Sequence, residues 1–206
     1  MSIHLLPIRK KVTTVPASEP VTVSEAKDWC YVTGSDHDTL FGNLIKTARQ
    51  MIEKDFGIAL ITQTVECYFD EFPSIHSHYN PDGGFFLPVF PVQSVTSITY
   101  TDSDGNNQTV SSSDYVLENM DDSRHRITLA YGASWPTARD IPNAVKVTVS
   151  AGYGNSSTDV PEPFRTAILL LVKFWYDNPE DIALSGYGWN RSAQQIIRNF
   201  VPAWLA

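Results

Sequence analysis

The sequence has few cysteines and no long apolar run, and both absences exclude classes of protein. Cys30 and Cys67 are the two cysteines among 206 residues, and neither lies in a C-x-x-C pair, so a disulfide framework is not predicted. The longest apolar run, 167–172, stops at Lys173, far short of the roughly 20 residues of a membrane span. The N-terminus lacks the apolar stretch of a signal peptide. We therefore expect a soluble protein with two buried thiols, made in a reducing cytoplasm and not bound to a membrane.

Positive charge is also scarce. Fifteen Lys and Arg stand against 23 Asp and Glu, which gives a formal net charge of −8. Affinity for DNA comes mainly from cationic side chains on phosphates, and anionic membrane surfaces attract basic segments in the same way. The composition therefore argues against a protein that grips phosphates. Aromatic residues, in contrast, are plentiful: ten Phe, nine Tyr and five Trp supply a sizeable core.

Catalytic motifs are missing as well. Ser134 lies in "GASW", without the second glycine of a nucleophile elbow. Cys67 falls on the apolar face of an expected strand, where burial raises the pKa of a thiol and makes it inert. The segments "GYGNSS" and "GYGWNRS" match neither phosphate-binding glycine pattern. We expect that the protein is not an enzyme and has no cofactor.

Two polar segments contain side chains that can bind metal ions. His76, His78 and Asp82 in "HSHYNPDG" offer two imidazoles and a carboxylate, but a fourth ligand that would close a structural zinc site is not evident. The oxygen-bearing side chains of 102–108 alternate as at the start of a calcium loop, but the terminal glutamate is missing. We interpret the first segment as a polar loop and the second as a hairpin turn, and predict no metal.

The first helical segment begins with a capping box. Thr22 is placed as the N-cap, and Glu25 follows three residues later. Each side chain can then accept a hydrogen bond from the backbone N–H of the other residue. The helix is predicted over about 23–32, with Gly34 ending it. Residues 1–20, which are polar and interrupted by prolines, are predicted to form an extended arm.

The second helical segment is longer and amphipathic. Ser35 or Asp36 is expected to cap it, and Gly57 to end it as the glycine after the last turn. Apolar residues recur at a period near 3.6 on one face, with charges on the other. The predicted apolar face comprises Leu40, Phe41, Leu44, Ile45, Ala48, Met51, Ile52 and Phe56, and the predicted charged face comprises Lys46, Arg49, Glu53 and Lys54.

Between residues 60 and 153 the pattern changes from helical to β. In the first strand the alternation predicts that Val65, Cys67 and Phe69 are core, with Glu66, Tyr68 and Asp70 facing outward. Short strands separated by turn signals imply an antiparallel sheet, a sandwich or a small barrel. The predicted strands are 60–69, 85–87, 94–101, 109–110, 115–118, 126–130 and 144–151.

The helical period returns after residue 160. Pro161 and Pro163 suit a first helical turn, and the helix that follows, to Tyr176, is apolar nearly all round. Such a helix is buried in its own chain or against another subunit. The candidate residues of this core or subunit packing helix are Phe164, Ile168, Leu171, Val172 and Trp175. A last helix over 192–201 and an apolar chain end follow.

The order of elements predicts an α+β fold. We expect a helical bundle built from the N- and C-terminal helices, because short helices need tertiary burial to be stable. An antiparallel β domain, either a sandwich or a small barrel, is inserted between them. The predicted divisions are an arm at 1–20, a discontinuous helical core at 21–58 plus 160–201, an inserted β domain at 59–155 and a tail at 202–206.

An ordered series of segments from Pro20 to about Glu180 carries a family resemblance. The series is "PVTVSEAKDW", "LIKTARQMIEKDFGIALITQTVECYFDEFP", "LPVFPVQSVTSITYTDSDG", "SSSDYVLE", "AVKVTVSAGYG" and "VPEPFRTAILLLVKFWYDNPE". In this order the segments resemble tailed-phage and prophage head–tail connector (adaptor) proteins, specifically the larger subfamily with a β insertion. The segment after Ala183 matches this pattern least.

The resemblance implies a structural role in a virion. It implies a homo-oligomeric ring, of twelve subunits, beneath the portal protein at the head–tail interface, assembled from chains made in the host bacterial cytoplasm. The ring would extend the DNA channel, let DNA pass without sequence-specific binding, and dock the tail or a stopper protein. The C-terminal segment would reach the portal, with Phe200, Val201, Pro202, Trp204 and Leu205 as candidate portal-binding residues.

Two other classes of function stay open at this point. A carbohydrate- or ligand-binding β module of a phage tail would need an exposed aromatic platform, for which Tyr79, Phe85 and Phe86 are candidates. These three residues could equally be core of a hairpin. An enzyme with an unrecognised site is the third and least supported class.

Overall fold

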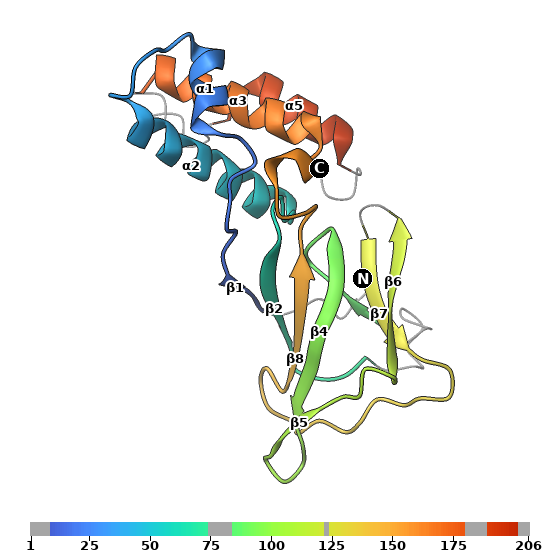
Figure 1. The fold of residues 1–206 in the computed structure, drawn as a ribbon. Coiled ribbons are helices and arrows are strands. Elements are labelled where there is room, and N and C mark those ends of the chain that lie inside the picture. The colour runs from blue at the N-terminus through green and yellow to red at the C-terminus, as the bar shows by residue number, and fades with distance from the viewer. Residues whose placement is uncertain (1–8, 74–83, 122–123, 180–188, 202–206) are drawn as a thin grey trace. The chain divides into compact units, whose positions relative to one another are not determined.

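The structure, a computed structural model, describes residues 9–73, 84–121, 124–179 and 189–201. The chain contains both helices and antiparallel sheets, so the fold class is α+β (Figure 1). It divides into two compact units, each built from two stretches of sequence. The β unit comprises Met1–Val15 with Thr62–Gly152, and the helical unit comprises Pro16–Ile61 with Tyr153–Ala206.

The β unit contains two antiparallel sheets. The larger sheet has five strands in the order β1-β2-β8-β4-β5, and the smaller has three in the order β3-β7-β6. The five strands are β1 (Arg9–Thr14), β2 (Gln63–Phe69), β8 (Val145–Ala151), β4 (Val92–Thr101) and β5 (Asn107–Thr109). The three are β3 (Phe85–Phe86), β7 (Arg124–Leu129) and β6 (Tyr115–Asp121).

The alternation predicted for β2 is confirmed. Val65, Cys67 and Phe69 are buried, whereas Glu66 and Tyr68 are half-buried on the opposite face. Strand β8, its neighbour in the sheet, buries Val145, Val147 and Val149 in the same register. Because side chains on a strand alternate between faces, these two strands give the larger sheet one apolar and one polar face.

Aromatic rings fill the core between the two sheets. Phe69 of β2 lies 4.6 Å from Phe85 of β3, measured between ring centroids. Phe72 stacks on Trp135 at 5.3 Å and also lies 6.0 Å from Phe85. Phe85 itself is fully buried. Aromatic side chains contribute large apolar areas, so this cluster helps to join the larger sheet to the smaller one.

The hairpin predicted over residues 101–109 is confirmed. Strands β4 and β5 pair with Thr101 opposite Asn107. Asp102 holds the turn, because its carboxylate accepts hydrogen bonds from the backbone N–H of Asp104 at 3.0 Å and of Asn106 at 2.9 Å. Gly105 adopts a φ of 91°, a conformation that favours glycine. The alternating oxygens thus serve the turn.

The predicted arm is corrected by strand β1. Residues Arg9–Thr14 pair with β2 as an edge strand, and they belong to the β unit, whereas Pro16–Pro20 belongs to the helical unit. All six residues of β1 are exposed, so the strand lacks the apolar alternation by which strands are found in a sequence.

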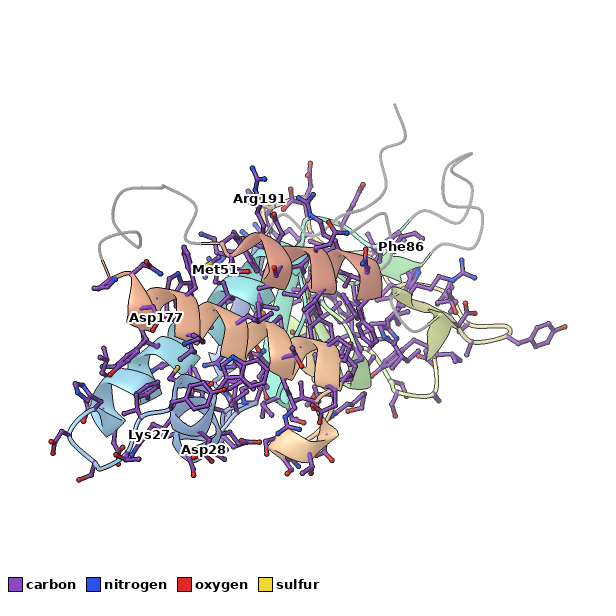
Figure 2. The ribbon with its side chains drawn as sticks, turned by 90° about the horizontal axis from the view of Figure 1, so that it is seen from above. Lys27, Asp28, Met51, Phe86, Asp177 and Arg191 are labelled. Atoms are coloured by element: carbon purple, nitrogen blue, oxygen red, sulfur yellow. The ribbon has the colours of Figure 1, made fainter. Side chains whose placement is uncertain are left out.

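The helical unit is built around one central helix. Helix α3 packs against α1, α2 and α5, and Figure 2 shows it between α5 and α1. The helices are α1 (Val23–Cys30), α2 (Asp38–Phe56), α3 (Glu162–Asp177) and α5 (Arg191–Phe200), with a short 3₁₀ turn, η1, at Ser157–Asp159. In the described part of the chain, no helix has both the length and the apolar character that a membrane crossing requires.

Helix α1 confirms the predicted start but not the predicted end. Thr22 and Glu25 form the capping box. The helix ends at Cys30, not near Gly34, because Tyr31 adopts the left-handed conformation with a φ of 58°. Its N–H then bonds back to the carbonyl of Asp28 at 3.2 Å. A non-glycine residue at this position gives little signal in a sequence.

Helix α2 also departs from the prediction at its start and on its charged face. His37, not Ser35 or Asp36, is the N-cap, and its side chain makes no capping bond. Gly57 ends the helix in the left-handed conformation, as predicted. Leu40 is 43% exposed although it was assigned to the apolar face, and Arg49 is buried although it was assigned to the charged face.

Candidate functional site

Arg49 is the centre of a buried charge cluster in the helical unit. Its Nε donates to Glu19 Oε2 at 2.7 Å, and its Nη1 donates to Glu53 Oε2 at 2.6 Å. The second oxygen of Glu53 accepts the backbone N–H of Leu60 at 3.0 Å. The cluster therefore ties three segments together: the stretch before α1, helix α2 and the chain that leaves α2 after Gly57.

The pKa values of this cluster reflect both burial and pairing. Burial raises the pKa of Glu53 above its ordinary value, and the charge of Arg49 and the Leu60 N–H oppose that rise only in part. Burial alone would lower the pKa of Arg49, but the hydrogen bond to Glu19 and the charges of Glu53 and Glu19 raise it. Arg49 thus stays charged inside the protein, as arginine does.

Arg165, in the first turn of α3, forms a second cluster with α1. Its guanidinium bonds Glu25 and Glu162, and its Nε donates to the carbonyl of Pro20 at 3.2 Å. Burial raises the pKa of Glu25, but hydrogen bonds from Thr22 and the charge of Arg165 outweigh it, so the pKa lies below its ordinary value. This cluster holds the start of α3 against the start of α1.

An apolar groove of about 460 Å³ lies beside these clusters in the helical unit. Its apolar lining comes from Val21 before α1, Val23 at the start of α1, and Gly42 and Ile45 of α2. A Cβ built at Gly42 would meet no atom within 4 Å, so the groove is open above the helix. The lining residues are Ser18, Glu19, Val21, Thr22, Val23, Gly42, Ile45, Asn155, Ser156 and Ser157.

The predicted portal-binding residues lie at the end of α5. Phe200 is 46% exposed and sets the edge of its ring against Phe164 of α3, with 5.1 Å between centroids. Val201 is buried, and its N–H caps α5 through the carbonyl of Ile197 at 2.8 Å. Pro202, Trp204 and Leu205 lie outside the described residues. Phe200 is thus partly exposed to solvent while its ring packs on α3.

The predicted packing helix is buried within the single chain. The five residues named from the sequence, Phe164, Ile168, Leu171, Val172 and Trp175, are all at most 3% exposed. Leu169, Leu170 and Phe174, on the rest of α3, are half-buried. The main apolar face of α3 is therefore occupied by the helices of its own unit.

A set of exposed apolar residues around the α1–α2 connection was not found from the sequence. Trp29 is 40% exposed, Tyr31 91% and Leu40 43%. The ion pair of Lys27 with Asp38, at 2.6 Å, holds this connection.

The candidate nucleophiles and metal ligands do not form one site in the described part of the chain. Cys67 is buried as predicted, and burial raises the pKa of its thiol to about 12, whereas Cys30, also predicted to be buried, is half-buried. Ser134 is exposed in a loop. His76, His78 and Asp82 lie outside the described residues. Within the described ranges, no three His, Cys, Asp or Glu side chains come together in a way that could hold a metal ion.

The aromatic platform expected of a ligand-binding β module is not supported. Phe85 is fully buried against Phe69, Phe72 and Trp135. Phe86 is half-buried, and Tyr79 lies outside the described residues. Phe85 thus belongs to the core of the β unit and not to an exposed platform.

Comparisons with known proteins agree on one family and one fold. Residues 19–188 match the family model described as "Head completion protein". Among solved structures, the chain resembles one from the virion of a native gene transfer agent particle, with a TM-score of 0.72 and 22% identity over 94% of this chain and 95% of that chain.

Two further structures come from the necks of such particles. One is the neck of an empty gene transfer agent particle computed with C6 symmetry, with a TM-score of 0.70 and 24% identity over 94% of this chain and 95% of that chain. The other is the neck of a native particle computed with C12 symmetry, with a TM-score of 0.61 and 24% identity over 83% and 85%. At these identities the likeness is one of fold. No curated protein matches the chain in sequence.

Proposed function

This chain belongs to the head completion protein family, and we propose that it is a structural component of the neck of a tailed phage or prophage, where the head meets the tail. The resemblance of its sequence to head–tail connector proteins is confirmed at the level of the family. The observation that carries the proposal is the extent of the match: residues 19–188 span segments of both compact units. The family is one of structural proteins, so we propose no catalytic role.

The proposed assembly is a homo-oligomeric ring of twelve copies beneath the portal protein. Support comes from the chains of similar fold, which belong to necks computed with C6 and C12 symmetry. The ring would extend the DNA channel and offer the tail or a stopper protein a docking surface. A net charge of −8 fits a channel wall along which DNA slides, because an acidic surface repels phosphates.

The proposed architecture assigns one task to each unit. The helices before residue 58 and after residue 160 would form the body of the ring, with the β domain inserted between them at about 59–155. Support for this division comes from the two clusters around Arg49 and Arg165, which hold the segments of the helical unit together. A helical unit held together in this way would present a stable surface to the neighbouring copies of the ring.

The proposed portal anchor is the end of the chain, from Phe200 through Leu205. Aromatic residues that are partly exposed at a chain end are typical anchors of a protein interface. Phe200 fits this role, because 46% of its surface is exposed while its ring is oriented by Phe164.

The experiment that tests the proposal measures assembly on the cognate portal. Native mass spectrometry of the chain, alone and mixed with portal, should show a ring bound to portal. Removal of residues 202–206, which keeps the buried Val201, should weaken portal binding at least tenfold and leave the circular dichroism spectrum unchanged. Ile141→Ala, at an exposed site of the β unit, is the matched control and should bind normally.

Two results would count against the proposal. A chain that never associates with portal, alone or in a ring, would overturn the role in the neck. Undiminished portal binding after removal of 202–206 would overturn the anchor alone.

A further inference from the structure

The two edges of the five-stranded sheet carry opposite charge. Strand β1 forms one edge, and its sequence Arg9-Lys10-Lys11 holds three cations and no acid. Strand β5 forms the other edge, and the turn that leads into it contains Asp102 and Asp104 and no cation. Every residue of both strands is exposed. Edge strands present backbone groups that pair readily with another chain.

All three cations of β1 are exposed, and Lys10 donates to the carbonyl oxygen of Pro88 at 3.5 Å. Arg9 lies over the ring of Tyr68 at 5.0 Å from its centroid, a contact that leaves its positive charge in place. The acid on the neighbouring strand, Glu66, lies opposite Lys11, pairs with Lys146 at 3.1 Å and accepts a hydrogen bond from the hydroxyl of Tyr68 at 2.6 Å. The β1 edge is therefore positive on balance.

The hairpin edge is negative on balance. Asp102 is held by the turn, and hydrogen bonds from Gln108 and from the backbone N–H of Asn106 lower its pKa. Asp104 is exposed at the tip. The guanidinium of Arg139 lies beside Gly105 of the turn. Asp140 follows Arg139 directly in the sequence. Three acids thus stand against one cation in this part of the β unit.

The register of the sheet places the two charged edges at nearly the same height. One row of paired residues crosses all five strands: Arg9, Tyr68, Lys146, Thr99 and Thr109. The hairpin's last pair, Thr101 with Asn107, lies two rows further along, about 7 Å at the usual rise of a strand. Four successive antiparallel pairings also mean that β1 and β5 run in the same direction.

We infer that the β1 edge of one copy of this chain docks against the β4–β5 hairpin edge of the next copy. Two β1 edges repel each other, and so do two hairpin edges, so the charges favour only the unlike pair. Contact between unlike edges is head-to-tail, and such contacts close into rings when the rotation between copies permits it. The inference rests on the proposed ring and names the surfaces that build it.

The charged side chains of β1 suit an edge strand that meets an acidic partner better than one that has no partner. Charged side chains on an edge strand normally prevent pairing with other sheets. Opposite an acidic edge, however, the same side chains attract, and two copies in the same orientation need a stagger of about two residues to bring Arg9 level with the turn. Charge therefore selects the partner strand as well as excluding others.

Charge reversal on each edge tests the inference. One variant carries Arg9→Glu and Lys11→Glu, and a second carries Ser103→Lys and Asp104→Lys, which keeps the Asp102 turn. Each variant alone should associate at least tenfold more weakly than the unmodified chain at low salt, measured by sedimentation velocity alone and on the portal. A one-to-one mixture should recover assembly, because each reversed edge then meets its complement. A ring with an even number of copies closes in this alternating order.

The controls separate the edges from charge in general. Lys46→Glu with Lys54→Glu changes the charge by the same amount as the Arg9 and Lys11 variant, but on exposed sites of α2, and should leave assembly unchanged. A ring that forms equally well from either edge variant overturns the edge contact and leaves the proposed function standing. A mixture that stays dissociated also overturns the edge contact. An unmodified chain that forms no ring, alone or on portal, overturns the proposed ring and the inference with it.

Discussion

The helical unit and the β unit use their charged residues in opposite ways. The helical unit turns arginine inward: Arg49 is 4% exposed and is paired with two carboxylates, and Arg165 bonds Glu25 and Glu162. The β unit has an aliphatic and aromatic core and carries Arg9, Lys11 and Asp104 exposed at its edges. Charge therefore fixes chain segments in the helical unit, while the β unit keeps several charged side chains exposed at the edges of its larger sheet.

The difference matches what each unit has to hold together. Strands bond to their neighbours through the backbone, so a sheet needs only apolar side chains to build a core. Helices satisfy their backbone internally, and the irregular stretch before α1 and the chain after Gly57 have no such ladder. Glu19 and Glu53 join these stretches to Arg49. In the helical unit, these ion pairs hold irregular segments that backbone hydrogen bonds would hold in a sheet.

The largest expected effect tests the aromatic core of the β unit. Phe85→Ala should lower the free energy of unfolding by about 4 kcal/mol, because a buried phenyl ring is removed and a cavity remains. Urea unfolding followed by tryptophan fluorescence measures the change, since Trp135 packs on Phe85 at 5.3 Å. Val116→Ala, at a side chain that is 48% exposed, is the control and should cost well under 1 kcal/mol. Equal losses in both variants would contradict an aromatic core.

The next effect tests the buried cluster of the helical unit. Arg49→Met should lower the free energy of unfolding by about 3 kcal/mol, because Glu53 loses its partner while it stays largely buried. Chemical denaturation monitored by circular dichroism at 222 nm measures the loss. Adding Glu53→Gln to Arg49→Met should recover part of it, since the unpaired charge is then gone. Lys46→Met, exposed on the same helix, should be nearly neutral, and a neutral Arg49→Met would show that the cluster contributes little.

The fate of Arg49 shows where sequence reasoning stops. The period of α2 predicted its buried Phe41, Ile45, Ala48 and Ile52 correctly, because each apolar residue faces the core by its own spacing. Arg49 stands between them, and its burial depends on Glu19, thirty residues away, as well as on the nearby Glu53. A local pattern does not contain such a distant partner, so the charged face was assigned wrongly.

Strand β1 was missed for a related reason. Its six exposed residues show no apolar alternation, and what makes them a strand is pairing with β2 more than fifty residues later. Helix α3 was easier: its bounds, 162–177, agree within two residues with the prediction, because an apolar run between Pro161 and Asn178 is a strong local signal. For the candidate site, the sequence predicted Phe200 and its neighbours as an anchor but gave no indication of the groove or of the exposed Tyr31.

A smaller effect concerns the pH dependence of stability, which distinguishes the partly buried ion pair of Glu25 from the exposed pair of Glu162. Glu25→Gln should lower the free energy of unfolding by about 1 kcal/mol at pH 7, because the capping box of α1 loses its charged acceptor. The pKa of Glu25 in the folded protein lies below its ordinary value of 4.5. A carboxylate of this kind stabilises the fold above the ordinary pKa, and the contribution is lost as the pH falls through the folded pKa.

The measurement compares unfolding of the two proteins from pH 7 to pH 3. The difference between unmodified chain and Glu25→Gln should shrink as the pH falls below 4.5. Glu162→Gln is the matched control: its carboxylate also pairs with Arg165, but it is 76% exposed, and exposed pairs contribute little. An equal loss from both variants would mean that Arg165, and not the capping box, determines the effect.

The smallest effect has the opposite sign and compares one exposed tyrosine in each unit. Tyr31 is 91% exposed and adopts a φ of 58°, which costs an L-residue with a bulky side chain about 1 kcal/mol. Tyr31→Gly should therefore raise the free energy of unfolding by about 0.5 kcal/mol, after the extra flexibility of glycine in the unfolded chain is subtracted.

Tyr131 of the β unit is the matched control for Tyr31. It is also fully exposed, but its φ is not positive, so Tyr131→Gly should give no gain and a loss of a few tenths of a kcal/mol. Thermal and urea unfolding of both variants measure the two signs. A gain at Tyr31 would mean that the unmodified protein keeps a strained tyrosine where glycine is more stable, which favours a contact role for the exposed side chains at the α1–α2 connection. If Tyr31→Gly gives no gain, the left-handed conformation carries little strain, and Tyr31 needs no explanation beyond the end of α1.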